Sequence, residues 1–400
     1  MSLTNTPLAN RIHIAFFGKR NAGKSTLVNA VTNQEISVVS DVKGTTTDPV
    51  YKSMELLPLG PVAIIDTPGY DDEGELGALR VNKTKQVLNK TDIAVLVVDA
   101  TEDLTKYEEN MINLFKDKNI NYLIAYNKCD LLNKIPDSNE KNIYVSADKK
   151  INIDLLKEKI GSLAPKDSDT IRIAGDFIKN DDVVILVTPI DEAAPKGRMI
   201  LPQQQTIRDA LDSNAICITV QETELEKTLK MLNCKPKLVI TDSQVFGKVS
   251  KIVPDDILLT SFSILVARTK GLLESAVKGA SYIDKLKDND TVLISEGCTH
   301  HRQCNDIGTV KLPKLIEIRC GKKINFEFSS GTQFPEELSK YALVIHCGGC
   351  MLNEREIKYR VKCANDQNIP ITNYGTAIAY MNNILKRSLE ILPEYQKLLV

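Results

Sequence analysis

The sequence predicts an α/β protein in which a large N-terminal domain is followed by two smaller domains, each built on a mainly parallel sheet. First, 400 residues with a hydrophobic fraction of 42% are enough for two or three cores. Second, short apolar runs alternate with helical stretches along the whole chain, as in βαβ units. Third, a polar stretch at 165–169 indicates a boundary. We therefore predict domains at 1–165, 170–265 and 266–400.

A phosphate-binding loop follows the first predicted strand, Arg11 to Phe17. Its sequence, Gly18-Lys-Arg-Asn-Ala-Gly-Lys-Ser25, opens directly into a predicted helix. The glycines let backbone N–H groups face phosphate oxygens, Lys24 reaches the β- and γ-phosphates, and Ser25 can bind Mg²⁺. The residues predicted to surround the phosphates are Gly18, Asn21, Ala22, Gly23, Lys24, Ser25 and Thr26.

Four further segments resemble GTPase motifs, each in the expected order. Gly44-Thr-Thr-Thr-Asp48 resembles switch I of bacterial GTPases such as Era and the tRNA-modifying GTPases, and Asp66-Thr-Pro-Gly69 resembles the segment that faces Mg²⁺ and the γ-phosphate. Asn127-Lys-Cys-Asp130 and Val145-Ser-Ala147 resemble the guanine-binding segments. The resemblance implies a Ras-like P-loop GTPase domain that binds GTP, GDP and Mg²⁺. It implies catalytic roles for Lys24, Thr46, Asp66 and Gly69, magnesium binding by Ser25, Thr46 and Asp66, and guanine binding by Asn127, Lys128, Asp130, Ser146 and Ala147.

Two positions in these motifs bear on the rate of hydrolysis. Tyr70 stands where GTPases of the Ras type have a glutamine that orients water, so we expect slow intrinsic hydrolysis or another device. Asn21 matches the position that binds K⁺ in potassium-activated members of the family, which implies K⁺-stimulated hydrolysis. The alternative is that Asn21 only shapes the loop.

Cysteines concentrate in the last third of the chain, where two apolar runs end in cysteine-bearing turns. Tyr341 to Ile345 is followed by His346-Cys-Gly-Gly-Cys350, and Thr291 to Ser295 is followed by Glu296-Gly-Cys-Thr-His-His301. Because parallel strands end at the same sheet edge, we expect Cys298 to lie near the Cys347/Cys350 pair. Such a pair can hold two corners of a zinc or iron–sulfur site, and the alternative is a pair of ordinary buried thiols.

The combination of a GTPase domain with Cys-x-His and, after residues 301–345, His-Cys-x-x-Cys resembles the [FeFe]-hydrogenase maturation GTPases. The resemblance extends over the whole chain. It implies that Cys298, Cys347 and Cys350 hold a [4Fe–4S] cluster and that the protein is a homodimer. It further implies a scaffold that carries a transient two-iron precursor between radical-SAM maturation enzymes and apo-hydrogenase.

Three cysteines leave one iron of such a cluster with a replaceable ligand. Thiolate chemistry favours Cys304 as a permanent fourth ligand, whereas a labile site calls for a weaker donor, and the sequence leaves this open. The exchangeable or supporting candidates are His300, His346, Glu296 and Asp306.

Composition narrows the remaining classes of function. A net charge of −1 and the absence of an RNA-binding motif give no reason to expect a nucleic-acid partner. The first ten residues lack a signal pattern and no apolar run approaches about eighteen residues, so we expect a cytoplasmic protein without membrane attachment. The middle domain has no recognisable catalytic constellation and is expected to serve dimerisation. The main alternative is a potassium-activated GTPase with a structural zinc domain that acts in RNA modification or ribosome assembly.

Overall fold

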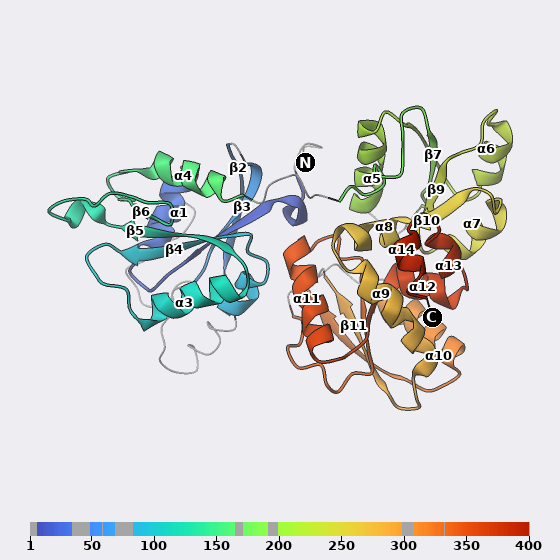
Figure 1. Cartoon of the computed structure of the whole chain (residues 1–400). Helices are drawn as coiled ribbons and strands as arrows, with labels where there is room; N and C mark the ends of the chain where they lie inside the picture. Colours follow the sequence, from blue (N-terminus) through green and yellow to red (C-terminus); the bar gives the residue numbers. More distant parts are fainter. Residues whose placement is uncertain are drawn as a thin grey trace. The chain divides into compact units, whose positions relative to one another are not determined.

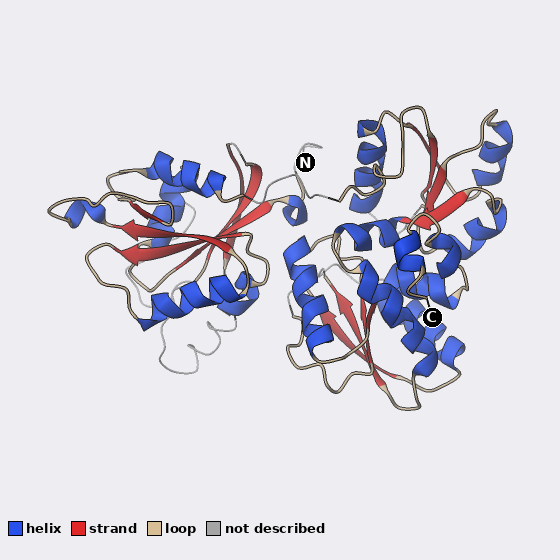
Figure 2. Cartoon of the chain, in the orientation of Figure 1, coloured by secondary structure: helices blue, strands red, loops and turns tan. Residues whose placement is uncertain are grey.

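In the described part of the chain, mainly parallel strands build three sheets in the computed structural model (Figures 1 and 2). The structure describes residues 6–33, 49–57, 59–68, 83–164, 171–190, 199–297, 307–331 and 333–399. The chain divides into two compact units, Met1–Ser168 and Asp169–Val400. One sheet belongs to the first unit and two belong to the second, which confirms the predicted α/β class. Within the described ranges, no helix has the length and apolar character needed to cross a membrane.

The sheet of the first unit has the strand order β2-β3-β1-β4-β5-β6, and only the edge strand β2 runs antiparallel to its neighbour. Successive side chains of β1 point to opposite sides of the sheet, and helices cover both sides. Phe16 packs with Leu27 of α1, whereas Phe17 packs with Phe115 of α3 on the other face. The bounds are β1 Ile12–Phe17, β2 Val50–Leu56, β3 Gly60–Asp66, β4 Ile93–Asp99, β5 Asn121–Asn127, β6 Asn142–Tyr144, α1 Lys24–Thr32, α3 Lys106–Asp117 and α4 Ile153–Ser162.

Burial of His13 is expected to make the stability of the first unit depend on pH. Burial in β1 and the nearby charge of Lys90 lower the pKa of His13 from 6.5 to about 4. The unfolded chain therefore binds a proton at His13 more readily than the folded state does. The contribution of His13 to the free energy of unfolding is fully present above about pH 6.5 and is lost as the pH falls towards 4. We expect a loss of about 2 kcal/mol between about pH 7 and about pH 5.

A His13→Gln variant, which cannot take up this proton, should lose much less stability over the same range. Urea unfolding followed by hydrogen exchange of the β1 peptide at both pH values measures the difference. If the variant keeps the full pH dependence of the wild type, a group other than His13 causes it.

The second unit contains two four-stranded parallel sheets, in the orders β10-β9-β7-β8 and β12-β11-β13-β14. One hydrophobic cluster joins them, since Phe246, Leu265 and Leu273 share it with Val344 of β13. The strands are β7 Val183–Val187, β8 Ile216–Val220, β9 Leu238–Thr241, β10 Leu258–Ser261, β11 Thr291–Glu296, β12 Asn325–Ser330, β13 Leu343–His346 and β14 Ile371–Asn373. The helices are α5 Leu201–Asp212, α6 Leu225–Met231, α7 Phe246–Ile252, α8 Phe262–Thr269, α9 Leu273–Ala280, α10 Leu312–Cys320, α11 Glu354–Asp366, α12 Tyr374–Met381, α13 Leu385–Ser388 and α14 Pro393–Gln396.

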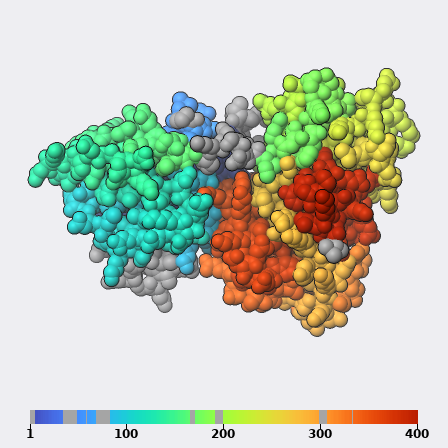
Figure 3. Space-filling view, in the orientation of Figure 1, coloured from blue at the N-terminus to red at the C-terminus, as the bar shows by residue number. Residues whose placement is uncertain are grey.

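The C-terminal helix α13 of the second unit packs against the first of its two sheets. Arg387 of α13 donates to the backbone oxygens of Ser250, Val253 and Pro254, each at 2.7 Å. In Figure 3 the C-terminal residues, drawn in red, accordingly lie beside the yellow residues around α7. The two sheets of this unit are therefore interlocked by the chain itself.

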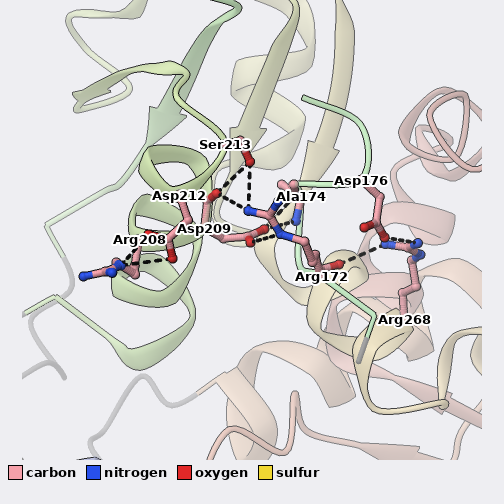
Figure 4. A network of polar contacts seen from close by, with 9 residues as sticks. Arg172, Ala174, Asp176, Arg208, Asp209, Asp212, Ser213 and Arg268 are labelled. Atoms are coloured by element: carbon pink, nitrogen blue, oxygen red, sulfur yellow. Dashed lines mark hydrogen bonds and ion pairs between the residues drawn. The ribbon is translucent and has the colours of Figure 1, made fainter. Parts of the chain in front are cut away.

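A polar network fixes the first described segment of the second unit to α5 and α8 (Figure 4). Asp209 of α5 accepts from Arg172 Nε at 2.8 Å and from the N–H groups of Ala174 and Gly175, each at 2.7 Å. Arg268 of α8 donates to Arg172 O at 3.0 Å and to Asp176 Oδ2 at 2.6 Å. The segment that follows the predicted linker is thus held by both helices.

The sequence predicts a helical stretch from Ala267 to Leu286 that Gly271 and Gly279 interrupt, and the structure divides this stretch differently. Gly271 does end α8, with a φ of +70° between that helix and α9. Gly279, expected to interrupt the stretch as well, lies inside α9. A Cβ atom there would come within 2.2 Å of Ile371 O, so this glycine permits close packing of α9 on β14.

Candidate functional site

The phosphate-binding loop connects β1 to α1, as the sequence predicts. Gly18 and Gly23 have φ values of +151° and +81°. A Cβ atom on Gly18 would meet Val97 O at 2.2 Å, and one on Gly23 would meet Asn127 Nδ2 at 2.3 Å. Both glycines are therefore required by backbone conformation and by space. Thr26 follows in the first turn of α1.

Lys24 and the described magnesium candidates lie at the start of α1. Lys24 is 6% exposed, and its Nζ donates to Gly18 O at 2.8 Å and to Lys19 O at 2.6 Å. Ser25 Oγ donates to Asp66 Oδ2 at 2.7 Å, so the hydroxyl and the carboxylate predicted to serve Mg²⁺ are adjacent. Thr46, Gly69 and Tyr70, together with the rest of the predicted switch I, lie outside the described residues.

Asn127 joins the phosphate-binding loop to the predicted guanine-binding segments. Its Nδ2 donates to Ala22 O at 3.0 Å, and its Oδ1 accepts from Ala147 N at 3.0 Å. Lys128 forms an ion pair with Asp99 Oδ2 at 2.5 Å. The buried side-chain amide of Asn127 thus connects three loops at the same edge of the sheet. Asp130 is the middle residue of the 3₁₀ turn Cys129–Leu131, and Ser146 is fully buried beside Ala147.

Asn21 has a structural reason for its place in the loop. It is exposed and has a φ of +63°, a left-handed conformation that asparagine tolerates better than most residues. Loop shape alone would explain an asparagine here, so a role in binding K⁺ must be tested separately from backbone conformation.

The two cysteine-bearing turns start from adjacent strand ends. β11 and β13 are parallel neighbours, with Ser295 opposite His346. Cys347 N–H donates to Ser295 O at 2.8 Å, and Gly297 N–H donates to Cys347 Sγ at 3.0 Å. Gly297, the residue before Cys298, is thus in hydrogen-bond contact with Cys347. Cys298 itself, with His300, His301, Cys304 and Asp306, lies outside the described residues.

The sulfur of Cys347 has the surroundings of a ligand to a positive centre. It accepts N–H groups from Gly297 and, at 3.3 Å, from Gly349. Burial raises the pKa of the Cys347 thiol, and these two N–H groups act in the opposite direction by stabilising the thiolate. Backbone N–H groups directed at cysteine sulfur also tune iron–sulfur clusters, so these surroundings of Cys347 are compatible with a cluster ligand. Cys347 and Cys350 are free thiols in this structure.

His346 is buried and uses both of its ring nitrogens. Nε2 lies 3.0 Å from Arg360 Nη1, and Nδ1 lies 2.7 Å from Cys347 O. Because the guanidinium only donates, Nε2 accepts and Nδ1 carries the proton. Burial, and after it the charge of Arg360, lower the pKa of His346 to about 3. In this arrangement His346 supports the turn, and neither nitrogen is available as a ligand.

Arg360 and Glu356 form a buried ion pair under the turn that the sequence analysis did not identify. Arg360 is 1% exposed and contacts Glu356 Oε1 at 2.9 Å, Gly331 O at 2.6 Å and Ser295 Oγ at 3.3 Å. The i,i+4 spacing of the two residues on α11 is the sequence signal that could have indicated the pair.

Two more polar side chains face the same turns. Glu296 is 5% exposed at the end of β11, and its Oε1 accepts from Tyr374 Oη at 3.2 Å. Lys270 donates from Nζ to Gly349 O and Leu352 O, and, like Arg360, it belongs to no sequence motif. Among the residues that the structure describes, no group of three or more His, Cys, Asp and Glu side chains is gathered around a common centre.

Three family models match the chain in succession. A model described as "50S ribosome-binding GTPase" matches residues 13–128. A model of the hydrogen maturase F dimerization domain matches residues 173–271, and one of the hydrogen maturase F tetramerization domain matches residues 274–391. The two hydrogen maturase F models together occupy more than half of the chain, including the turn with Cys347 and Cys350.

Similar proteins match over a smaller part of the chain. It is 36% identical over 152 residues to the tRNA modification GTPase MnmE of Desulforamulus reducens, covering 36% of this chain and 32% of that protein. It is 34% identical over 167 residues to GTPase Der of Wolinella succinogenes, with coverages of 38% and 35%. The chain thus spans about a third of the length of these relatives. A solved structure of an Aquifex aeolicus Era variant bound to GDP.AlF4⁻ is 20% identical, with a TM-score of 0.35 and coverages of 55% and 98%.

The order of the three matched regions distinguishes this chain from these GTPases. A GTPase domain is followed directly by the two domains described for hydrogen maturase F, and the second of them contains the His-Cys-x-x-Cys turn. The chain therefore belongs to the HydF family of [FeFe]-hydrogenase maturation GTPases.

Proposed function

We propose that this protein is a GTP-hydrolysing scaffold that holds a [4Fe–4S] cluster and carries the two-iron precursor of [FeFe]-hydrogenase to the apo-enzyme. The observation that supports it most is the contact of Gly297 N–H with Cys347 Sγ, which joins the two cysteine-bearing turns in a chain that also has a GTPase domain. Radical-SAM maturation enzymes and apo-hydrogenase are the proposed partners. Family membership supports this assignment.

The GTPase domain is proposed to bind GTP and GDP with Mg²⁺. Lys24 and the loop from Gly18 to Ser25 would contact the phosphates, and Ser25 and Asp66 would hold the metal with Thr46. Asn127, Lys128, Asp130, Ser146 and Ala147 would form the base site. The network of Asn127 supports this assignment, because it fixes the base site relative to the phosphate loop.

Asn21 is proposed to bind K⁺ through its side-chain amide, and a glycine substitution can separate this role from loop shape. An Asn21→Gly variant keeps the left-handed conformation without strain but has no amide. We expect K⁺ to stimulate GTP hydrolysis by the wild type roughly tenfold or more over Na⁺, and the variant to retain only the Na⁺ rate. Equal rates of the wild type in K⁺ and Na⁺ would remove the proposal.

The cluster is proposed to be held by Cys298, Cys347 and Cys350. In such a cluster one iron would have no cysteine ligand, and a second iron group could attach at that exchangeable position. Because both nitrogens of His346 are engaged, we favour Glu296, His300 or Asp306 over His346 for that position. Glu296 already lies at the end of β11, beside the turn.

Residues 170–265 are proposed to form the dimerisation domain and residues 266–400 the cluster-binding domain of a cytoplasmic homodimer. The two matching family models describe a dimerization domain and a tetramerization domain, which supports self-association and a tetramer as a further state. Light scattering of the purified protein distinguishes the dimer from the tetramer.

Anaerobic reconstitution with iron and sulfide tests the scaffold proposal. The wild type should become brown, bleach on reduction and give a four-iron EPR signal, which Cys347→Ala should lose or show strongly weakened. Cys363→Ala is the matched control, because Cys363 on α11 contacts Glu336 O and lies outside the proposed ligand set. A colourless wild-type protein that binds zinc would instead support the alternative of a GTPase with a structural zinc domain.

A further inference from the structure

Lys270 has a backbone position fixed by the sheet that precedes the cysteine-bearing domain. α8 starts immediately after Ser261, the last residue of β10. It ends in a Schellman motif, in which Gly271 has a φ of +70° and the N–H groups of Gly271 and Leu272 donate to Arg268 O and Ala267 O. Lys270 is the last residue before that glycine, so the helix end determines where its side chain starts.

The ammonium group of Lys270 binds the turn that carries the cysteines. Its Nζ donates to Gly349 O and to Leu352 O, each at 2.5 Å. These two carbonyls lie on either side of Cys350, and Leu352 N–H also donates to Gly349 O at 3.0 Å. One side chain thus holds both ends of the turn.

Lys270 also places a positive charge near sulfur. Burial lowers the pKa of Lys270 to about 8, whereas negative charge on the sulfurs of Cys350 and Cys347 acts in the opposite direction. Burying an ammonium is costly unless it has polar partners, and here its partners belong to the cysteine turn. A cluster held by thiolates is anionic, so a nearby cation would favour its reduced form.

We propose that Lys270 is a positioning residue of the cysteine centre, which holds the Cys347–Cys350 turn through two carbonyls and places a cation beside the bound cluster. Holding the turn does not depend on iron, whereas the effect on the cluster rests on the proposed function. Lys270 lies within residues 173–271 and the turn within residues 274–391, so this contact joins the regions matched by the two hydrogen maturase F models.

Hydrogen exchange of the full-length protein without iron tests the first part. In Lys270→Met, which keeps most of the side-chain volume but cannot donate, exchange in the peptide covering residues 347–352 should be about tenfold faster. Lys278→Met is the matched control, because Lys278 on α9 pairs only with exposed Glu274 among the contacts described, and the turn should keep its wild-type rate. Unchanged exchange in Lys270→Met, or an equal increase over all of residues 274–391, would overturn the proposal.

The reduction midpoint potential of the reconstituted cluster tests the second part. Lys270→Met should shift it to a more negative value, whereas Lys270→Arg, which keeps the charge, should leave it close to the wild-type value. A wild-type potential in Lys270→Met would show that the lysine places no effective charge at the cluster. A wild type that forms no iron–sulfur cluster contradicts the proposed function instead, and the exchange result on iron-free protein stands independently of it.

Discussion

Gly349→Ala is expected to displace the cysteine turn and to abolish most cluster binding. Gly349 has a φ of +62°, a conformation that costs an alanine about 1–2 kcal/mol. A Cβ atom there would also lie 2.6 Å from Cδ1 of Ile357, a side chain that is only 1% exposed. Crowding of a packed site typically costs about 1–3 kcal/mol more, so we expect a total of about 2–5 kcal/mol. Iron content after reconstitution and hydrogen exchange of residues 347–352 measure the loss.

Gly348→Ala is the matched control for this prediction. Gly348 does not have a positive φ, and no atom lies within 4 Å of a Cβ atom built on it. It should therefore retain wild-type iron content. A double variant, Gly349→Ala with Ile357→Val, removes the close Cδ1 contact but keeps the backbone strain, so partial recovery would separate the two causes. Equal iron content in the two single alanine variants would contradict the prediction.

The Gly-Gly pair also illustrates what the sequence could and could not predict at the site. The sequence indicates a close turn between Cys347 and Cys350, because strand and motif are local features. It does not indicate that only Gly349 is required, since that depends on the φ of +62° at Gly349 and on the packing of Ile357 from α11. The same holds for the phosphate loop, where the motif was predictable but the contact of Gly23 with Asn127 was not.

Fold prediction succeeded where strands are buried on both faces and was incomplete at sheet edges. Central strands such as β4 and β13 are continuous apolar runs, which is typical of parallel sheets covered by helices. The edge strands β2 and β12 were not predicted, because they are partly exposed and carry mixed polar and apolar side chains. α11 was also missed, since its many charged residues hide the apolar stripe that packs on the core.

The supporting residues of the cysteine turn were missed for a different physical reason. Lys270 lies about 80 residues before the carbonyls it binds, and Arg360 binds Ser295 across a gap of 65 residues. No spacing rule connects such pairs, because the sheet order that brings them together is a property of the tertiary fold. Both residues would be read from the sequence as ordinary surface charges on helices.

Arg360→Met is expected to destabilise the second unit by about 3–5 kcal/mol. The substitution removes the partner of Glu356, whose side chain is 6% exposed, and leaves that carboxylate buried without its ion pair. It also removes the hydrogen bond to His346 Nε2, so the turn with Cys347 should loosen.

The same helix provides a matched control for Arg360. Lys358 and Glu354 form an ion pair with the same i,i+4 spacing, but their side chains are 59% and 54% exposed. Lys358→Met should therefore change stability by less than about 0.5 kcal/mol. Adding Glu356→Leu to Arg360→Met should recover part of the loss, because the unpaired carboxylate is then absent. Denaturant-dependent hydrogen exchange of peptides from residues 274–391 gives the free energy of unfolding for each variant. Similar losses in Arg360→Met and Lys358→Met would contradict the prediction, because they would show that burial does not make the Arg360–Glu356 pair more important than an exposed pair on the same helix.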